Sequence, residues 1–493
     1  MKSVSQKVIQ SSSFLLLIQV VQRGLGIIST LILARLLAPE QFGIIALVAI
    51  SLQLFDILAD TGNQHYIIQK DNVSDQDLNT AWSLDLGIKS LMMLLIIASA
   101  PFISAYFNAP QLCLALWVSS LVLPIKAVRN PILMLQAKQL NYKPVFKLHL
   151  WQKVASFCFV ISIALIWQTF WAIVIGNLIA TLVFTLGSYR ISSYRPQLDF
   201  RNINEQWRFS KWLILRGIVG FTRSQIDSIL VSRWFGTREL GGFHLLRELA
   251  IMPALNLVIP ASEPLQAAIA HDRHQQQTLA YRTRFSLALL SSLLLPISCF
   301  MWLYPVSIVS VLLGEQWLSY APLLQPFSLY FFTFCLFSLC CNACLAVGQA
   351  RLLFWFDLVS TAIIVTSLLY FQSAILLELT WLRAWLAILT TVSLMAILER
   401  KTTFNWIKLL LMLLPACFGL LLSVLMVELI APLINLPVLV EIILNGLIFC
   451  CAFVIGFVFI CRITSLISME IHIFQTHLQR LMPARLHFIF TKV

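Results

Sequence analysis

Apolar runs of about 18 residues or more recur along nearly the whole of this 493-residue chain, and each is long enough to cross a hydrocarbon core of about 30 Å as a helix. Only 11% of the residues are charged, whereas 59% are hydrophobic. A soluble domain averages about 25% charged residues and needs them to cover its surface. A transmembrane β-barrel would instead show short segments of alternating polarity. The sequence therefore predicts an all-α polytopic membrane protein.

Prolines and glycines at many of the breaks between apolar runs allow the spans to be counted. We predict fourteen transmembrane helices, at residues 12–34, 43–64, 86–106, 111–131, 148–167, 170–189, 210–232, 242–262, 285–306, 321–344, 352–371, 374–398, 407–430 and 438–461.

The lysines and arginines test this count, because they gather in cytoplasmic loops. With the N-terminus inside, 26 of the 34 fall in cytoplasmic ends and loops, three in outer loops and five inside spans. Both termini are therefore expected to be cytoplasmic. The same bias accounts for the formal charge of +13, so no nucleic-acid partner is expected.

A short stretch of sequence occurs twice. In "ARLLAPEQFG", Arg35 is followed eight positions later by Gly43, and in "SRWFGTRELGGF", Arg233 is followed eight positions later by Gly241. Each stretch joins the first two helices of a predicted group of six, on the outer side. A turn repeated in one orientation indicates two parallel, pseudo-symmetric six-helix bundles around a central cavity, although a chance match is the alternative.

This repeat sets the predicted domain boundaries. The first six-helix half is 1–205 and the second is 206–400, followed by an extra helix pair at 401–465. Residues 466–493 carry apolar residues at roughly helical spacing with scattered basic ones, and we expect an amphipathic cytoplasmic tail there.

Two arginines are predicted to lie near the membrane midplane. Arg23 precedes Arg35 by twelve residues and Arg223 precedes Arg233 by ten, which places them about 18 Å and about 15 Å below the outer turns. Arg23 has no acidic residue three or four positions away, so its charge needs another helix, water or a ligand. A guanidinium in a cavity suits an anionic ligand, because it pairs with phosphate in a fork geometry.

Other charged residues fall within the predicted spans. Asp227 lies one helical turn after Arg223, so a local ion pair and a functional role are both open. Asp56 and Asp60 share a helix face and are either proton-coupling carboxylates or partners of Arg23. Arg216 lies near an inner helix end, where its side chain can reach the interface. The candidate substrate-binding residues are Arg23, Arg223, Asp227, Asp56, Asp60 and Arg216.

The sequence carries no motif for a cofactor or a metal. Most of the 11 cysteines lie inside apolar runs, where cysteine packs as a small apolar residue, and no pair of CxxC elements stands near histidines. No GxxxxGK[ST] motif for a nucleotide is present. We therefore expect no metal, no cofactor and no ATP-driven motor in the chain.

Four loop motifs carry a resemblance to a known family: "ARLLAPEQFG", "SRWFGTRELGGF", "YRPQLDF" and "GEQWLSYAPLLQ". From about residue 5 to 465 the chain resembles the Wzx-type polysaccharide flippases, in the branch that includes the colanic acid exporter. These belong to the multidrug/oligosaccharidyl-lipid/polysaccharide superfamily.

The resemblance implies a bacterial inner-membrane flippase for undecaprenyl-diphosphate-linked oligosaccharide repeat units, acting in exopolysaccharide, capsule or lipopolysaccharide biosynthesis. It also implies that cavity arginines meet the diphosphate, and Arg23 is the best match. Phe221 stands at the repeat equivalent of Arg23, so a strictly symmetric clamp is not expected. Proton or sodium ions are candidate coupling ions, and a polysaccharide polymerase and assembly proteins are candidate partners.

Three other function classes compete with a flippase. An enzyme, such as a polymerase or a lipid-dependent glycosyltransferase, would need a substantial outer loop, and no predicted outer loop exceeds about fifteen residues. The sequence therefore disfavours an enzyme. A drug or metabolite antiporter of the same superfamily and a structural membrane scaffold are the remaining alternatives.

Overall fold

The structure is a computed structural model of the chain. It describes the backbone of residues 4–60, 62–70, 72–138, 143–201, 203–255, 269, 275–372, 375–431, 436–467, 471–472 and 475–476. Some side chains within these ranges are not described, chiefly those of 4–16 and 203–216.

The chain forms two compact units, Met1–Leu245 and Leu246–Val493, called here the N-terminal and C-terminal units. Within the described ranges both are built from helices, without β-strands. The all-α fold is therefore confirmed, whereas the predicted domain boundaries at 205, 400 and 465 remain predictions.

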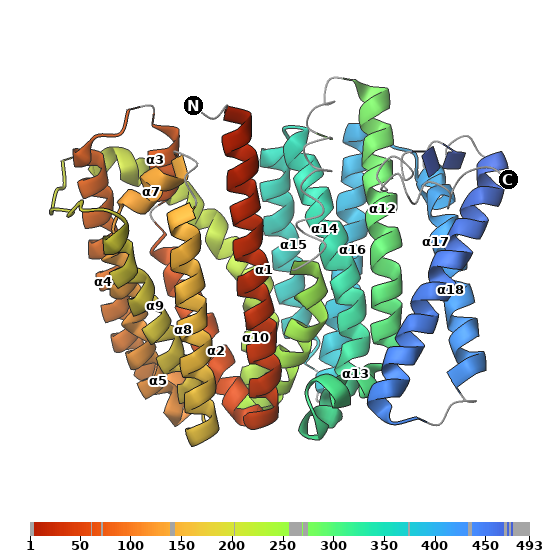
Figure 1. Cartoon of the computed structure of the whole chain (residues 1–493), viewed down its shortest axis with the longest axis horizontal. Coiled ribbons are helices and arrows are strands. Elements are labelled where there is room, and N and C mark those ends of the chain that lie inside the picture. The colour runs from red at the N-terminus through yellow and green to blue at the C-terminus, as the bar shows by residue number, and fades with distance from the viewer. Residues whose placement is uncertain are drawn as a thin grey trace. The chain divides into compact units, whose positions relative to one another are not determined.

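The N-terminal unit contains nine helices within the described ranges and most of a tenth (Figure 1). They are α1 (Val4–Leu36), α2 (Pro39–Leu58), α3 (Asn63–Gln69), α4 (Asp75–Tyr106), α5 (Pro110–Ser120), α6 (Val122–Ala127), α7 (Ile132–Lys138), α8 (Lys143–Trp167), α9 (Trp171–Ile191) and α10 (Ile203–Pro253), which continues into the next unit. The long helices α8 and α9 pack side by side, and α8 also packs against α1.

The C-terminal unit continues the same helical pattern. Its elements are α12 (Gln276–Leu303), α13 (Pro305–Leu312), a 3₁₀ segment η2 (Glu315–Leu323), α14 (Leu324–Ala346), α15 (Ala350–Tyr370), α16 (Leu376–Thr402), α17 (Trp406–Ile430) and α18 (Val438–Ile467). The helices α17 and α18 pack against each other at glycines: a Cβ on Gly419 would lie 2.8 Å from the carbonyl oxygen of Phe453.

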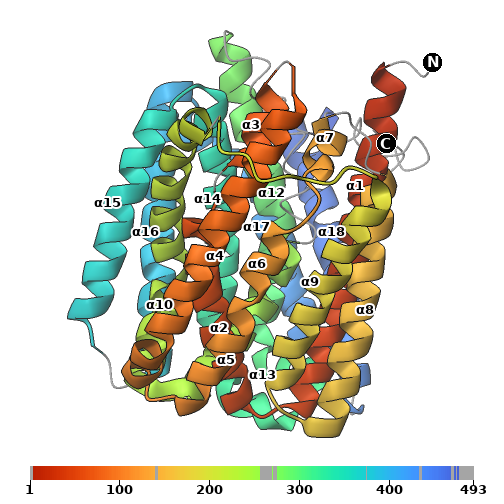
Figure 2. The same ribbon diagram turned by 90° about the vertical axis from the view of Figure 1, so that its left-hand side faces the viewer.

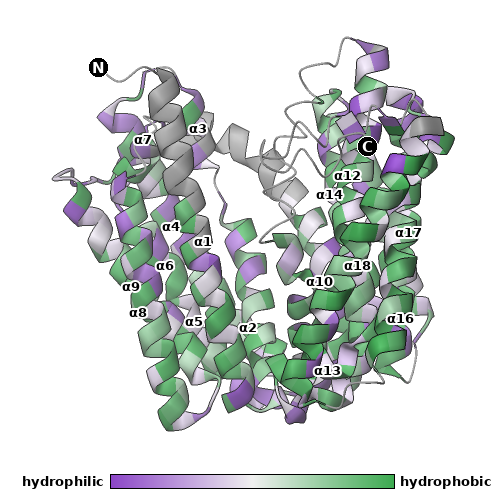
Figure 3. Cartoon of the chain, turned by 45° about the vertical axis from the view of Figure 1, so that its right-hand side comes forward, coloured by the Kyte–Doolittle hydropathy of each residue, from purple (hydrophilic) through white to green (hydrophobic). Residues whose placement is uncertain are grey.

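Eleven helices in the described part of the chain are long and apolar enough to cross a membrane. Hydrophobic residues dominate them in Figure 3, while polar residues mark stretches of α2 and α4. The chain is thus a multi-pass membrane protein. The predicted number of fourteen is compatible with this, because α1 and the two segments of α10 are only partly described.

Several predicted helix boundaries differ from the structure. The helix expected to begin at 86 begins at Asp75, because Ser74 forms a capping box in which its side chain and that of Asp77 bond each other's backbone N–H and satisfy two free donors of the first turn. The helix expected at 111–131 is interrupted at Leu121 and ends at Ala127.

The repeated turn is present at both predicted positions. The chain breaks between α1 and α2 at Leu37 and Ala38, and α10 breaks at Gly236, whose φ of 88° and ψ of 179° interrupt the helix. Gly236 is the repeat equivalent of Ala38. A glycine adopts this positive φ without the steric penalty of a side chain.

The two repeated turns, residues 35–43 and 233–241, contact each other inside the N-terminal unit. A Cβ on Gly43 would lie 1.8 Å from the carbonyl oxygen of Thr237, and one on Gly241 would lie 1.9 Å from that of Pro39. Beside them, Nε of Arg238 lies 3.3 Å from Oε1 of Glu40. Only glycine allows the two backbones to approach so closely.

The segment that leaves α9 runs across the beginning of α4 (Figure 2). Gln197 donates its backbone N–H to Oδ1 of Asn79 at 3.0 Å, and Asp199 donates its own to Oγ of Ser83 at 2.9 Å. The Tyr194 hydroxyl lies 2.8 Å from the same Asn79 oxygen. These bonds fix residues 194–199, most of the "YRPQLDF" motif, to one helix.

The predicted amphipathic tail, 466–493, lies mostly outside the described residues. Of its described part, Ile471 is buried against Cys461, with Phe457 and Val458 beside it. The amphipathic character of the tail remains a prediction.

Candidate functional site

A cavity of about 640 Å³ opens among the helices of the N-terminal unit. Side chains of α1, α2, α3, α4, α6, α7, α8 and α9 line it, together with the turns after α2 and α6. Three carboxylates and three cations face it: Asp56, Asp60, Asp85, Lys89, Lys126 and Arg129. So many charges among membrane-spanning helices indicate a polar ligand or pathway, because ionisable groups in the bilayer are costly unless they serve one.

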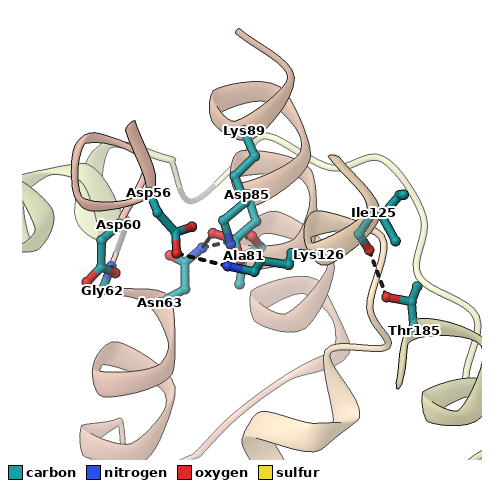
Figure 4. A network of polar contacts seen from close by, with 10 residues as sticks. All are labelled: Asp56, Asp60, Gly62, Asn63, Ala81, Asp85, Lys89, Ile125, Lys126 and Thr185. Carbon is teal, nitrogen blue, oxygen red and sulfur yellow. Dashed lines mark hydrogen bonds and ion pairs between the residues drawn. The ribbon is translucent and has the colours of Figure 1, made fainter. Parts of the chain in front are cut away.

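Asp56 and Lys126 join two helices across this cavity (Figure 4). Nζ of Lys126 lies 3.0 Å from Oδ2 of Asp56, and the two side chains are 31% and 41% exposed. They come from α2 and α6, 70 residues apart in the chain. Because both groups are partly exposed, the ion pair is weakly held, on the order of 1 kcal/mol or less.

A second group of polar contacts ties α3 to α4. Nδ2 of Asn63 donates to the carbonyl oxygen of Ala81 at 2.8 Å and to Oδ1 of Asp85 at 3.0 Å. Nζ of Lys89, one turn further along α4, lies 3.2 Å from the other Asp85 oxygen. Asp85 is therefore bonded both by a side chain of α3 and by one of its own helix.

The side chain of Asp60 accepts a hydrogen bond from the backbone. Its Oδ1 accepts the N–H of Gly62 at 2.9 Å, and Gly62 has a φ of 62°. The carboxylate thus stabilises the turn between α2 and α3 in the manner of an Asx turn.

Arg129 has a different environment from the other two cations. Its guanidinium carbon lies 4.4 Å from the centroid of the Phe184 ring, within the range of a cation–π contact. Its Nε atom is buried and has no hydrogen-bond acceptor among the residues that the structure describes. Burial lowers the pKa of Arg129 to about 10, and the nearby Asp56 opposes that shift. The guanidinium is therefore cationic at neutral pH.

The backbone around Arg129 is held from α9 and the segment after it. The N–H of Asn130 donates to Oγ of Ser188 at 3.0 Å, and its side-chain amide donates to the carbonyl of Tyr194 at 3.0 Å. Thr185 donates its hydroxyl to the carbonyl of Ile125 at 2.9 Å. These bonds fix the end of α6 and so set the direction from which Arg129 enters the cavity.

The Phe184 ring also contacts His149 of α8, with ring centroids 4.8 Å apart. Nδ1 of His149 is hydrogen-bonded to Nε2 of Gln22 on α1 at 3.0 Å. One aromatic ring therefore supports both the arginine and a histidine that connects α8 to α1.

The predicted site residues are distributed differently from expectation. Asp56 and Asp60 line the cavity, and Asp56 pairs with Lys126 rather than with Arg23. Arg23 does not line this cavity, and it makes no ion pair with a described residue. Its role in binding remains a prediction.

Arg223 and Asp227 of α10 do not line this cavity either. Asp227 is 1% exposed, and its Oδ1 accepts the backbone N–H of Ser228 at 2.9 Å. Arg223 is partly buried. The side chain of Arg216 lies outside the described residues.

Sequence reasoning missed Lys126, Arg129, Asp85 and Lys89 as cavity residues. It assigned Lys126, Arg129 and Lys89 to cytoplasmic loops under the positive-inside rule. Two signals were available: Asp85 and Lys89 are four apart, the spacing of a helical ion pair, and Lys126 and Arg129 are three apart at a helix end. Within the part of the chain described, no group of three or more His, Cys, Asp and Glu side chains is placed to hold a metal ion.

Known proteins resemble this chain in sequence. The lipopolysaccharide biosynthesis protein WzxC of Escherichia coli is 24% identical over 327 residues, covering 66% of this chain and 66% of that protein, just under two thirds of its length. The succinoglycan biosynthesis transport protein ExoT of Rhizobium meliloti is 24% identical over 380 residues, covering 75% of each chain.

Solved structures share the fold. The lipid II flippase MurJ in an inward closed conformation matches with a TM-score of 0.75 over 93% of this chain and 100% of its own, at 14% identity. A multidrug resistance transporter of the MATE family, in an inward-facing conformation, matches with a TM-score of 0.56 over 78% of this chain and 96% of its own, at 12% identity. At such identities the likeness shows the fold alone.

The sequence profile for polysaccharide biosynthesis proteins matches residues 32–322. Together with the relatives above, it confirms the resemblance to Wzx-type proteins of polysaccharide biosynthesis. Because this match spans more than half of the chain, the chain belongs to the polysaccharide biosynthesis protein family.

Proposed function

We propose that this protein is a flippase for undecaprenyl-diphosphate-linked oligosaccharide repeat units. It moves them from the cytoplasmic to the periplasmic leaflet of a bacterial inner membrane, for the synthesis of an exported polysaccharide. The observation that carries this proposal is the polar cavity of the N-terminal unit, which Arg129 lines with a buried Nε atom that has no acceptor among the described residues. Family membership supports it.

The physical need for such a cavity follows from the substrate. A sugar chain cannot cross hydrocarbon unaided, because each unpaired hydroxyl costs several kcal/mol there. A polar cavity that opens to one side of the membrane and then to the other removes that barrier. Only the headgroup has to enter it, since the lipid tail can stay in the bilayer.

Several finer points belong to the same proposal. Both termini are cytoplasmic, a proton or sodium ion provides the coupling, and a polysaccharide polymerase with its assembly proteins receives the product. The protein transports its substrate and performs no covalent chemistry. Arg23, Arg223 and Asp227 on the first helix of each predicted half are further candidates for headgroup contacts, together with Arg216, Asp56 and Asp60.

Deletion of the gene tests the function, with lipid-linked intermediates assayed separately in each leaflet. We expect the oligosaccharide intermediate to accumulate in the cytoplasmic leaflet, and the wild-type gene to reverse this. Normal appearance of the intermediate in the outer leaflet would contradict the proposal. Unchanged intermediates with altered drug sensitivity would instead support the antiporter alternative.

A further inference from the structure

The cations and carboxylates of the N-terminal cavity are not matched one to one by contact. Asp85 is bonded to Lys89 and Asn63, and Asp60 accepts the N–H of Gly62. Asp56 is the lining carboxylate left to balance both Lys126 and Arg129. Two cations thus share one carboxylate at this end of the cavity.

The two cations are placed to act on one ligand. Lys126 and Arg129 are three residues apart, and the N–H of Arg129 bonds the carbonyl of Lys126 at 3.3 Å. Both side chains line the same cavity as Asp56. The guanidinium carbon lies 4.4 Å from the centroid of the Phe184 ring, and a guanidinium that contacts an aromatic face can still donate its N–H groups to an anion.

We infer that Asp56 is an exchangeable counter-ion, which a phosphate-bearing headgroup displaces from Lys126 and Arg129 when it enters the cavity. This inference rests on the proposed function, and it names the phosphate-binding end of that site. A diphosphate carries more charge than a carboxylate and bonds a guanidinium in a bidentate fork. The Asp56–Lys126 pair is partly exposed on both sides, so breaking it costs little.

The exchange has a consequence for release. Once displaced, the Asp56 carboxylate lies beside the bound phosphate and repels it, since like charges at short range disfavour each other. When the headgroup leaves, Asp56 returns to Lys126. Asp56 therefore weakens binding and shortens the time for which the headgroup stays bound.

Binding of inorganic pyrophosphate to the purified full-length protein in detergent tests the exchange directly. Asp56→Asn should bind pyrophosphate roughly fivefold more tightly than wild type, the size expected when a partly exposed ion pair stops competing. Arg129→Gln should bind at least about tenfold more weakly, since it removes a charge-assisted fork.

Asp60→Asn is the matched control. It removes the same charge from the same cavity and from the end of the same helix, and asparagine can still accept the Gly62 N–H. The inference requires that it tighten binding less than Asp56→Asn. Equal tightening would mean that only the overall charge of the cavity matters, and it would overturn the specific role of Asp56.

A double-mutant cycle gives a second, independent reading. In a Lys126→Gln background, Asp56→Asn should tighten binding less than it does in the wild type, because one of the two shared cations is gone. An unchanged effect would refute competition for Lys126. If Asp56→Asn does not fold, Asp56→Glu replaces it: it retains the ion pair and should keep the wild-type affinity, and a large change would count against the exchange.

A second binding measurement, with undecaprenyl diphosphate and the protein in lipid nanodiscs, distinguishes a site for a lipid headgroup from a site for free phosphate. Binding of both ligands with the same variant pattern supports the exchange for the lipid headgroup. Pyrophosphate binding without a response to undecaprenyl diphosphate would sink that assignment. Failure of the proposed function can be told apart from failure of the exchange. In the first case the leaflet assay would show no defect, while the variants would still change pyrophosphate binding as described.

Discussion

Gly43 and Gly241 are equivalent residues of the two repeated turns, and each lies against the backbone carbonyl at the start of the other turn's second helix. A Cβ on Gly43 would meet the oxygen of Thr237, and one on Gly241 would meet that of Pro39. Pro39 and Thr237 are themselves 198 residues apart, the same offset as the two glycines. The contact is thus reciprocal, as a local two-fold relation requires.

This reciprocity predicts a large effect of a single methyl group. Gly241→Ala should destabilise the protein by about 1–3 kcal/mol, because a rigid backbone carbonyl fills the space that the methyl needs. Thermal unfolding of the detergent-solubilised protein measures it. Gly220→Ala on the same helix is the control, since nothing lies within 4 Å of its Cβ position. Equal stability of the two variants would contradict the contact.

The ion pair beside this contact should matter much less. Arg238 and Glu40 are 68% and 45% exposed, so Glu40→Gln should change the free energy of unfolding by less than about 1 kcal/mol. The same thermal assay at low and high salt measures this. A loss as large as that of Gly241→Ala would show that the charge pair, rather than the backbone fit, holds the turns together.

The Phe184 ring is expected to orient Arg129. Phe184→Leu removes the cation–π contact, worth about 0.5–2 kcal/mol, and should weaken pyrophosphate binding by about 2- to 30-fold. Phe184→Tyr keeps the ring and should retain most of the affinity. If the two variants bind alike, the ring contributes only apolar volume to the site.

Arg23 provides a test of the predicted midplane cation. If it contacts the diphosphate, Arg23→Ala should abolish polysaccharide export at near-normal protein abundance. Arg23→Lys should restore part of it, because a point charge still attracts phosphate but loses the bidentate bonds. Export and immunoblotting of the membrane fraction are the measurements. Normal export by well-expressed Arg23→Ala would remove Arg23 from the site.

The orientation in the membrane is testable with reporter fusions. A reporter active only in the periplasm should be active after Pro110, Leu318 and Leu436, and silent after Lys143, Arg201 and Lys401. The reason is the cytoplasmic excess of lysine and arginine. Activity after Arg201 would invert the second half and contradict two parallel halves.

The sequence was sufficient for the helical class and for the repeated turn, because both depend on local patterns. Apolar length identifies spans, and the Arg35–Gly43 and Arg233–Gly241 spacings coincide with the breaks at Ala38 and Gly236. Helix ends were less predictable. The start of α4 at Asp75 depends on a side-chain cap at Ser74, which an apolar window does not register.

The cavity could not be predicted because its contacts are distant in the chain. Asp56 and Lys126 are 70 residues apart, and nothing in a single sequence pairs them. The positive-inside rule also gave no reason to assign Lys126 and Arg129 to a cavity. It accounts for cations near cytoplasmic helix ends, so no ligand is needed to explain them. The role of these two cations in the cavity is recognised from the contact between Arg129 and the Phe184 ring. In the sequence, Phe184 is one of many apolar residues of α9, and nothing marks it as the residue that contacts an arginine.

The segment fixed across α4 limits how far the next helix can travel. Residues up to Asp199 are bonded to Asn79 and Ser83, and α10 begins at Ile203. Four residues of fully extended chain reach at most about 14 Å. The connection between α9 and α10 therefore limits the displacement of α10. Its first residue stays within that distance of α4 unless these hydrogen bonds break.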